Sequence, residues 1–123
     1  KEGGNIDEDA TVQRALRDAG YRTALLGKYL NGWPVERVPE HWDRWAMMAP
    51  PGYRNARFNL NGSIRRVRGY TTDFLARRAS SFIRQFEQEG APWFVTISVY
   101  APHEPFTPAK IGPEIAASTA LAS

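Results

Sequence analysis

Apolar positions recur at helical spacing in two stretches of the chain. In the first, Asp9 or Thr11 can cap a helix, and Gly20 stands where a helix C-terminus is expected. The apolar positions between these signals follow the i, i+3, i+4, i+7 spacing and are Val12, Ala15, Leu16 and Ala19. We therefore expect a short helix whose narrow apolar stripe covers one face of a larger unit.

A longer helix is predicted from residue 71 to residue 89. The Thr71-Thr72-Asp73 segment supplies capping side chains, and Glu89-Gly90-Ala91-Pro92 stops the helix. Its apolar stripe comprises Leu75, Ala79, Phe82, Ile83 and Phe86. This stripe predicts a face packed into the core.

Two apolar runs predict strands. Residues 23–26 are apolar except for Thr23 and end at Gly27, which is typical of a buried strand in a parallel sheet. In residues 93–100 the side chains at 95, 97 and 99 share one face, and those at 94, 96, 98 and 100 share the other. Each strand follows a helix, so we predict an α/β fold of mainly parallel strands with helical crossovers.

Residues 33–70 show little periodicity and contain four prolines, which predicts a long loop. One feature within it is readable. Asn61-Gly62 separates residues 57–60 from residues 63–67, and this pair favours a type I′ turn. We expect a single β-hairpin inserted in the loop.

Composition narrows the classes of function. The 123 residues fit one domain and carry a net charge of +3. Seven arginines but one acid, Asp73, lie between Arg54 and Arg78, which predicts either an anionic partner or a solvated basic face. Few aromatic residues interleave with these arginines, so nucleic-acid binding is not expected. With no cysteine and two histidines we expect no metal centre, and no stretch is apolar enough to span a membrane.

Candidate chemistry stands where the two predicted strands end. Lys28 directly follows the first strand and His103 follows the second. Ligands of open α/β sheets bind outside the carboxyl ends of strands, so these side chains are candidates for one site. The alternatives are an ordinary surface lysine and a structural histidine. The Glu104 carboxylate could orient the imidazole, but we expect it to face water.

Four segments carry a resemblance to a known family. GYRTALLGKYLNGW, the WDRW segment after Pro39, GYTTDFLARRASSFI and YAPHEPF occur in this order. Over residues 9–108 the chain resembles the sulfatases, most closely the N-acetylglucosamine-6-sulfatases and the extracellular heparan-sulfate endosulfatases. Two departures are visible. Leu30 replaces the histidine of the common GKWHLG motif, and His41 replaces a glycine that usually precedes Trp-Asp.

The resemblance implies hydrolysis of sulfate esters on a sulfated small molecule or glycan, by an alkaline-phosphatase-like α/β fold. It implies that Lys28 and His103 contact the sulfate, and Asn31 is a lower-ranked candidate for lining the same pocket. Sulfatases use calcium and a formylglycine made from a C/S-x-P-x-R motif, which this chain lacks. We therefore expect residues 1–123 to be a central part of a catalytic domain, inactive alone, with residues 109–123 as a tail.

Two other functions stay open. One is a related phosphodiesterase or phosphonate hydrolase, which differs from a sulfatase mainly at the nucleophile. The other is a non-catalytic binder of sulfated glycans that uses the Arg54–Arg78 patch. The open edges of a truncated sheet also predict self-association. Localisation is not encoded in these residues, although family members are commonly extracytoplasmic or secreted.

Overall fold

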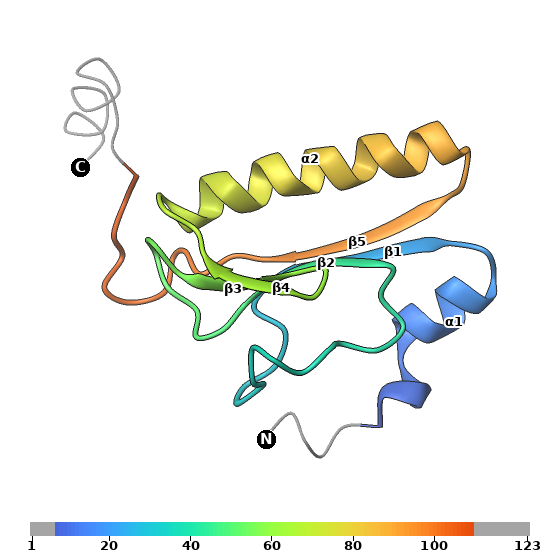
Figure 1. Cartoon of the computed structure of the whole chain (residues 1–123), viewed down its shortest axis with the longest axis horizontal. Coiled ribbons are helices and arrows are strands. Elements are labelled where there is room, and N and C mark those ends of the chain that lie inside the picture. The colour runs from blue at the N-terminus through green and yellow to red at the C-terminus, as the bar shows by residue number, and fades with distance from the viewer. Residues whose placement is uncertain (1–6, 110–123) are drawn as a thin grey trace.

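A computed structural model describes residues 7–109, in which one sheet has a long helix on one face (Figure 1). The elements in chain order are η2 (Glu8–Ala10), α1 (Val12–Asp18), β1 (Arg22–Gly27), β2 (Arg44–Met48), β3 (Arg57–Leu60), β4 (Ser63–Arg66), α2 (Thr71–Glu89) and β5 (Trp93–Ser98). The five strands form one sheet in the order β4-β3-β2-β1-β5. Beyond residue 109, the predicted tail lies outside the described residues.

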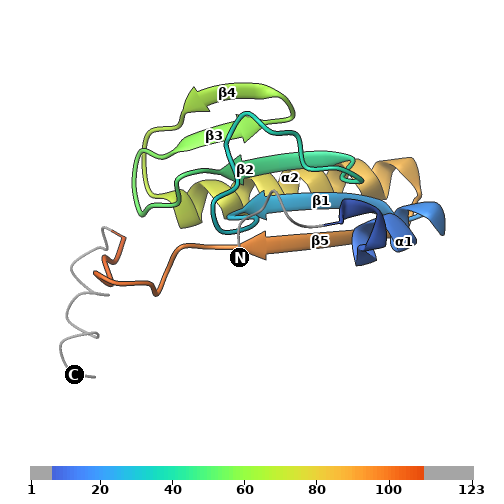
Figure 2. The same ribbon diagram turned by 90° about the horizontal axis from the view of Figure 1, so that it is seen from below.

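Three adjacent strands of this sheet, β2, β1 and β5, are parallel, and the β3–β4 hairpin completes it (Figure 2). β1 pairs with β2 on one side and with β5 on the other, so that Ala24 lies opposite both Arg44 and Val95. β2, β3 and β4 then pair antiparallel. Asn61 and Gly62 both have positive φ, 52° and 101°, as a type I′ turn requires. The predicted mainly parallel fold and its hairpin are confirmed.

Helix α2 packs its apolar stripe on the sheet. Leu75, Ala79, Phe82 and Phe86 are buried, and they join side chains of β1, β2 and β3 in the hydrophobic core. The helix ends at Gly90 with φ 71°, as predicted. The predicted cap is wrong, because the N-cap is Tyr70 and forms no side-chain cap bond. The Thr71 hydroxyl instead donates to the carbonyl of Gly52 at 2.6 Å, which ties α2 to the preceding loop.

The segment 33–70 is not only a loop with a hairpin, because it also contains β2. Ala46 and Met48 join the core under α2, while Met47 is buried as well. A strand buried on both faces lacks the alternation that marks a half-exposed strand. Alanine and methionine are also weak strand signals, so this element was missed.

Helix α1 forms, but its predicted apolar face is not buried in the described structure. Val12 is 60% exposed, whereas Gln13 is buried and donates to the Tyr29 hydroxyl at 3.1 Å. Thr11 is the N-cap without a side-chain cap bond, and Gly20 has φ 98° just after the helix, as expected.

The segment between β1 and β2 covers the sheet face opposite α2, on the same side as α1 (Figure 1). It buries Trp33, Val35 and Trp42, and the Trp42 ring stacks on Phe94 of β5. The outer edge of β5 is unpaired among the described residues, so the expected self-association stays a prediction. No helix within residues 7–109 is both long and apolar enough to cross a membrane.

Candidate functional site

Lys28 is placed by an unusually close contact between the ends of β1 and β5. Gly27 has φ 91°, and a Cβ atom at this position would lie 1.9 Å from the Ser98 carbonyl oxygen. A residue other than glycine therefore cannot occupy the position without a backbone shift. The next amide, that of Lys28, donates to the same Ser98 oxygen at 3.0 Å. Lys28 is thus held beside the chain that leaves β5.

His103 lies in the turn that follows β5. Its backbone amide donates to the Tyr100 carbonyl at 2.9 Å, and its ring stacks on Tyr100 with centroids 4.7 Å apart. The ring Nδ1 lies 2.7 Å from the Glu104 carbonyl oxygen. Because a carbonyl oxygen only accepts, Nδ1 carries the proton and Nε2 is left for a ligand. The exposed Glu104 thus contributes its backbone to the imidazole, not its carboxylate.

Lys28 and His103 line one small pocket of about 320 Å³, together with Pro51, Val99 and Tyr100. The two residues are 75 positions apart, and the parallel pairing of β1 with β5 brings their strand ends together. This is the juxtaposition that parallel strands predict.

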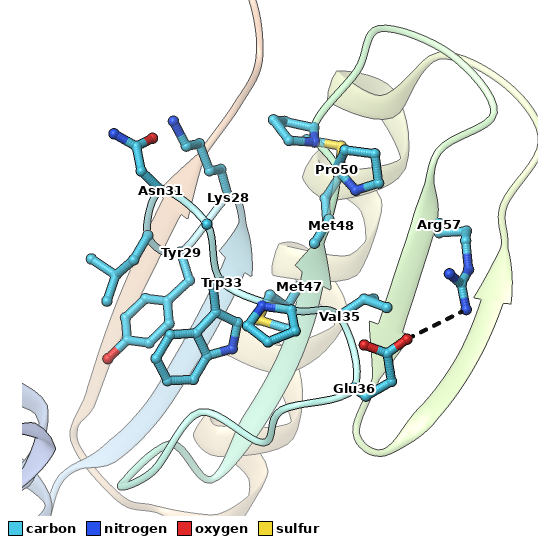
Figure 3. A pocket seen from close by; sticks show the side chains of 15 residues that line it. Lys28, Tyr29, Asn31, Trp33, Val35, Glu36, Met47, Met48, Pro50 and Arg57 are labelled. Atoms are coloured by element: carbon cyan, nitrogen blue, oxygen red, sulfur yellow. Dashed lines mark ion pairs between the residues drawn. The ribbon is translucent and has the colours of Figure 1, made fainter. Parts of the chain in front are cut away.

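Lys28 also lines a neighbouring pocket of about 450 Å³, and Asn31 lies there with it at one end (Figure 3). The floor of this larger pocket is largely apolar and aromatic, with Tyr29, Trp33, Val35 and Met47. A few polar groups over an apolar floor are typical of small-molecule sites. Asn31 does not line the smaller pocket with His103, so the three candidates are not all gathered in one pocket.

The charges around the two pockets favour an anionic ligand. Within the described part of the chain, the Lys28 ammonium has no ion-pair partner. Glu36 is the one carboxylate among the residues that line the pockets, and it lies 4.0 Å from Arg57. Burial raises the pKa of the Tyr29 hydroxyl above its usual value, so the phenol of the pocket floor stays neutral.

Several residues of the site were not predicted from the sequence. Pro51 lines both pockets, and Tyr53 donates its hydroxyl to the His103 carbonyl. Arg57 lies at the far end of the larger pocket from Lys28 (Figure 3). Placing them requires the pairing of β2 with β3, and no motif reveals that pairing. The run of apolar residues that ends in Met47-Met48 was the one signal available.

A second cluster brings together Asp9, Glu40 and His41, whose ligand atoms lie within 4.8 Å of one another. These groups are engaged with neighbouring side chains, since Asp9 Oδ1 lies 2.8 Å from His41 Nε2 and 3.6 Å from Arg14 Nη1. Glu40 and His41 precede the start of β2, whereas Lys28 follows the end of β1, so in this parallel pair the two sites lie at opposite edges of the sheet. His41 has φ 68°, a conformation that favours the glycine expected at this position.

Comparison with known proteins gives the site its context. The family model described as Sulfatase matches residues 3–120. The chain is 35% identical over 112 residues to an extracellular sulfatase Sulf-1 homolog of Caenorhabditis elegans, covering 85% of the chain and 16% of that protein. It is also 35% identical over 117 residues to human N-acetylglucosamine-6-sulfatase, covering 85% of the chain and 21% of that enzyme. The chain thus spans about a fifth or less of these relatives.

The fold has a solved counterpart in the structure of BT4656 in complex with its substrate D-glucosamine-2-N,6-O-disulfate. The TM-score is 0.71 with 26% sequence identity, and the match covers 87% of this chain and 21% of the other. This likeness confirms the predicted fold class, a part of an alkaline-phosphatase-like sulfatase domain. Together with the family match over most of the residues, it shows that this chain belongs to the sulfatase family, whose members hydrolyse sulfuric esters.

Proposed function

We propose that this chain forms the sulfate-binding part of a sulfuric ester hydrolase for sulfated sugars, with Lys28 and His103 contacting the sulfate. The observation that carries the proposal is the pocket of about 320 Å³ that these two residues share at the carboxyl ends of β1 and β5. The names of the relatives support a sulfated amino sugar as the substrate class. One is an N-acetylglucosamine-6-sulfatase, and the solved neighbour has a disulfated glucosamine as its substrate.

The two side chains suit complementary tasks. The Lys28 ammonium offsets negative charge on the sulfate oxygens, including charge that develops as the ester bond breaks. His103 Nε2 donates to a sulfate oxygen or to the leaving group when the ring is protonated, because Nδ1 is already held by the Glu104 carbonyl. The stacking on Tyr100 and the backbone contacts keep the imidazole in one orientation.

The pocket residues do not fit the calcium that the family uses. A calcium ion takes six to eight oxygen ligands, whereas Glu36 is the one carboxylate that lines these pockets. No cysteine is present, and no serine begins the S-x-P-x-R motif that yields formylglycine. We therefore assign the nucleophile and the metal to other residues of a complete sulfatase domain. The 123-residue chain binds a sulfated sugar but does not turn it over.

The test is a calorimetric titration of the chain with glucosamine-6-O-sulfate, glucosamine-6-phosphate and glucosamine. We expect binding of the sulfated sugar to exceed that of glucosamine, and Lys28→Ala to weaken it by at least about tenfold, as the loss of a charged hydrogen bond predicts. Arg84→Ala, which removes one exposed charge from α2, is the matched control and leaves binding unchanged. Thermal unfolding of each variant checks that it is folded.

Two results would contradict the proposal. Preference for the phosphate would favour a phosphodiesterase or phosphonate hydrolase. Equal losses in Lys28→Ala and Arg84→Ala would favour a diffuse basic surface as the binding site.

A further inference from the structure

The segment that carries His103 contains no helix or strand. Residues 101–109 follow β5, and His103 is exposed. Two backbone hydrogen bonds shape its turn, from the His103 amide to the Tyr100 carbonyl at 2.9 Å and from the Phe106 amide to the His103 carbonyl at 2.8 Å. Both bonds are local, so they do not fix where the imidazole lies relative to Lys28. That separation has to be set by contacts with other parts of the chain.

Two tyrosine hydroxyls from another part of the fold bind the backbone of this segment. The Tyr53 hydroxyl donates to the His103 carbonyl, and the Tyr70 hydroxyl donates to the Thr107 carbonyl at 2.6 Å. Within residues 7–109, no other hydrogen bond joins the segment to a residue that precedes Tyr100. Because both acceptors are backbone carbonyls, the two bonds hold the path of the chain and not the rotation of a single side chain.

Both tyrosines are themselves anchored at the start of α2. Tyr70 is the N-cap of the helix, and the buried Tyr53 lies in the loop between β2 and β3. The Thr71 amide donates to the Tyr53 carbonyl at 2.8 Å, and a backbone bridge joins Arg54 to Tyr70. Figure 1 shows the start of α2 and the chain that leaves β5 at the same end of the molecule. The two hydroxyls therefore connect the His103 turn to the helix that packs on the core.

The aromatic rings extend this connection to the imidazole. Tyr53 packs edge-on against Tyr100 with ring centroids 4.8 Å apart, and Tyr100 stacks on His103 at 4.7 Å. The Tyr70 ring lies 6.1 Å from the Tyr53 ring. Aromatic pairs attract one another at such separations, and edge-to-face and offset arrangements are preferred. The four rings thus form a continuous series of contacts from the N-cap of α2 to His103.

The loop that carries Tyr53 also forms part of the pocket wall. Pro51, which comes shortly before Tyr53, lines the pocket with Lys28 and His103. Hydrogen bonds from charged donors to anionic oxygens are about 2.7–2.9 Å long, so one sulfate group reaches both side chains only within a narrow range of separations. A displacement of about 1 Å is enough to weaken such an arrangement strongly. The position of residues 101–109 therefore decides whether Lys28 and His103 act on one group.

We infer that Tyr53 and Tyr70 are positioning residues, which hold His103 at the separation from Lys28 that one sulfate group requires. Neither tyrosine lines the pocket, and both act through the backbone of residues 103–107. This inference rests on the proposed function and adds the residues that prepare the pocket for binding.

The experiment is a double-mutant cycle in which glucosamine-6-O-sulfate is titrated calorimetrically into the chain and its variants. We expect His103→Ala to weaken binding by at least about tenfold, and Tyr53→Phe and Tyr70→Phe each by about fivefold, as the loss of one hydrogen bond predicts. In the His103→Ala background, neither phenylalanine substitution weakens binding further, because both act through His103. Tyr21→Phe is the matched control and leaves binding unchanged. The Tyr21 hydroxyl forms no hydrogen bond within residues 7–109, and Tyr21 precedes β1, at the opposite end of that strand from Lys28.

A second measurement reports the position of His103 without any ligand. Because the His103 ring stacks on Tyr100, nuclear magnetic resonance of the free chain detects a change in the stacking as a shift of the imidazole ring protons. We expect these signals to move in Tyr53→Phe and Tyr70→Phe but not in Tyr21→Phe. Thermal unfolding checks that each variant is folded.

The outcomes separate the inference from the proposed function. If His103→Ala weakens binding but Tyr53→Phe and Tyr70→Phe match Tyr21→Phe, the inference is wrong and the proposed function stands. Losses that persist in full in the His103→Ala background, or unchanged imidazole signals in both phenylalanine variants, would also overturn the inference alone. If His103→Ala leaves binding unchanged, the proposed function fails and the inference fails with it.

Discussion

Gly27→Ala probes the contact that places Lys28 beside the chain leaving β5. The new Cβ would lie 1.9 Å from the Ser98 carbonyl oxygen, while Cβ atoms essentially never approach another heavy atom within 3.0 Å. The two strand ends must therefore separate by at least about 1 Å, since backbone rather than a flexible side chain opposes the methyl group.

The expected cost has two parts. A φ of 91° strains any residue with a Cβ by about 1–2 kcal/mol. The separation also weakens the hydrogen bond from the Lys28 amide to Ser98, about 1 kcal/mol, and loosens the packing of β1 on β5. We expect a loss of at least about 3 kcal/mol in the free energy of unfolding, a large share of the 5–15 kcal/mol typical of a small domain.

Gly20→Ala is the matched control, because Gly20 has a similar φ of 98° but no heavy atom within 4 Å of the added Cβ. It should cost only the backbone part, about 1–2 kcal/mol. Urea unfolding followed by circular dichroism measures both variants, and titration with glucosamine-6-O-sulfate under native conditions measures binding. Gly27→Ala should weaken binding about tenfold, because a shift of 1 Å misplaces Lys28. Equal destabilisation by the two substitutions, with unchanged binding in both, would refute this reasoning.

Three further predictions concern other parts of the fold. Burial raises the pKa of the Tyr29 hydroxyl, so its contribution to stability is full below about pH 10 and is lost as the pH rises through the raised pKa. Between about pH 8 and pH 12, the free energy of unfolding of Tyr29→Phe should therefore fall less steeply than that of the unsubstituted chain. An identical fall in both would contradict this prediction. His41→Gly and His41→Ala both lose the contact with Asp9. Because residue 41 has φ 68°, the glycine variant should be more stable than the alanine variant by about 1 kcal/mol. Equal unfolding midpoints for the two variants would argue against backbone strain at this position. Thr71→Val should cost about 1 kcal/mol in urea unfolding, because the Gly52 carbonyl loses its donor; no change would show that this bond does not hold α2 to the loop.

The parts of the fold predicted from the sequence are those with a strong local signal. The stripe from Leu75 to Phe86, the buried run before Gly27 and the Asn61-Gly62 turn each follow from side-chain period or backbone conformation. β2 was missed because a strand buried on both faces carries no alternation, and Trp45-Ala46-Met47-Met48 is a weak strand sequence. The prediction of which face of α1 is buried was wrong. Gln13 is buried and donates a hydrogen bond to the Tyr29 hydroxyl, and no apolar pattern reveals such a bond.

The sequence predicts those residues of the candidate site that directly follow a predicted strand. Lys28 and His103 follow strands that are parallel neighbours, so topology alone brings them to one edge. Arg57 and Pro51 reach the site through the pairing of β2 with β3, which depends on contacts distant in sequence. The sheet face that each hairpin arginine takes likewise depends on register: Arg65 is the partner of the core residue Phe58 and Arg66 the partner of Arg57, and a shift of one residue exchanges the faces.

The central claim is that Lys28 and His103 bind one sulfate group. The most direct measurement is a titration of the isotopically labelled chain with glucosamine-6-O-sulfate, observed by nuclear magnetic resonance at the lysine Nζ, the histidine ring nitrogens and the arginine Nε. We expect the signals of Lys28 Nζ and His103 Nε2 to shift with the same dissociation constant, while His41 and the Arg84 side chain stay unchanged. Shifts confined to the arginines, or different dissociation constants for Lys28 and His103, would contradict it.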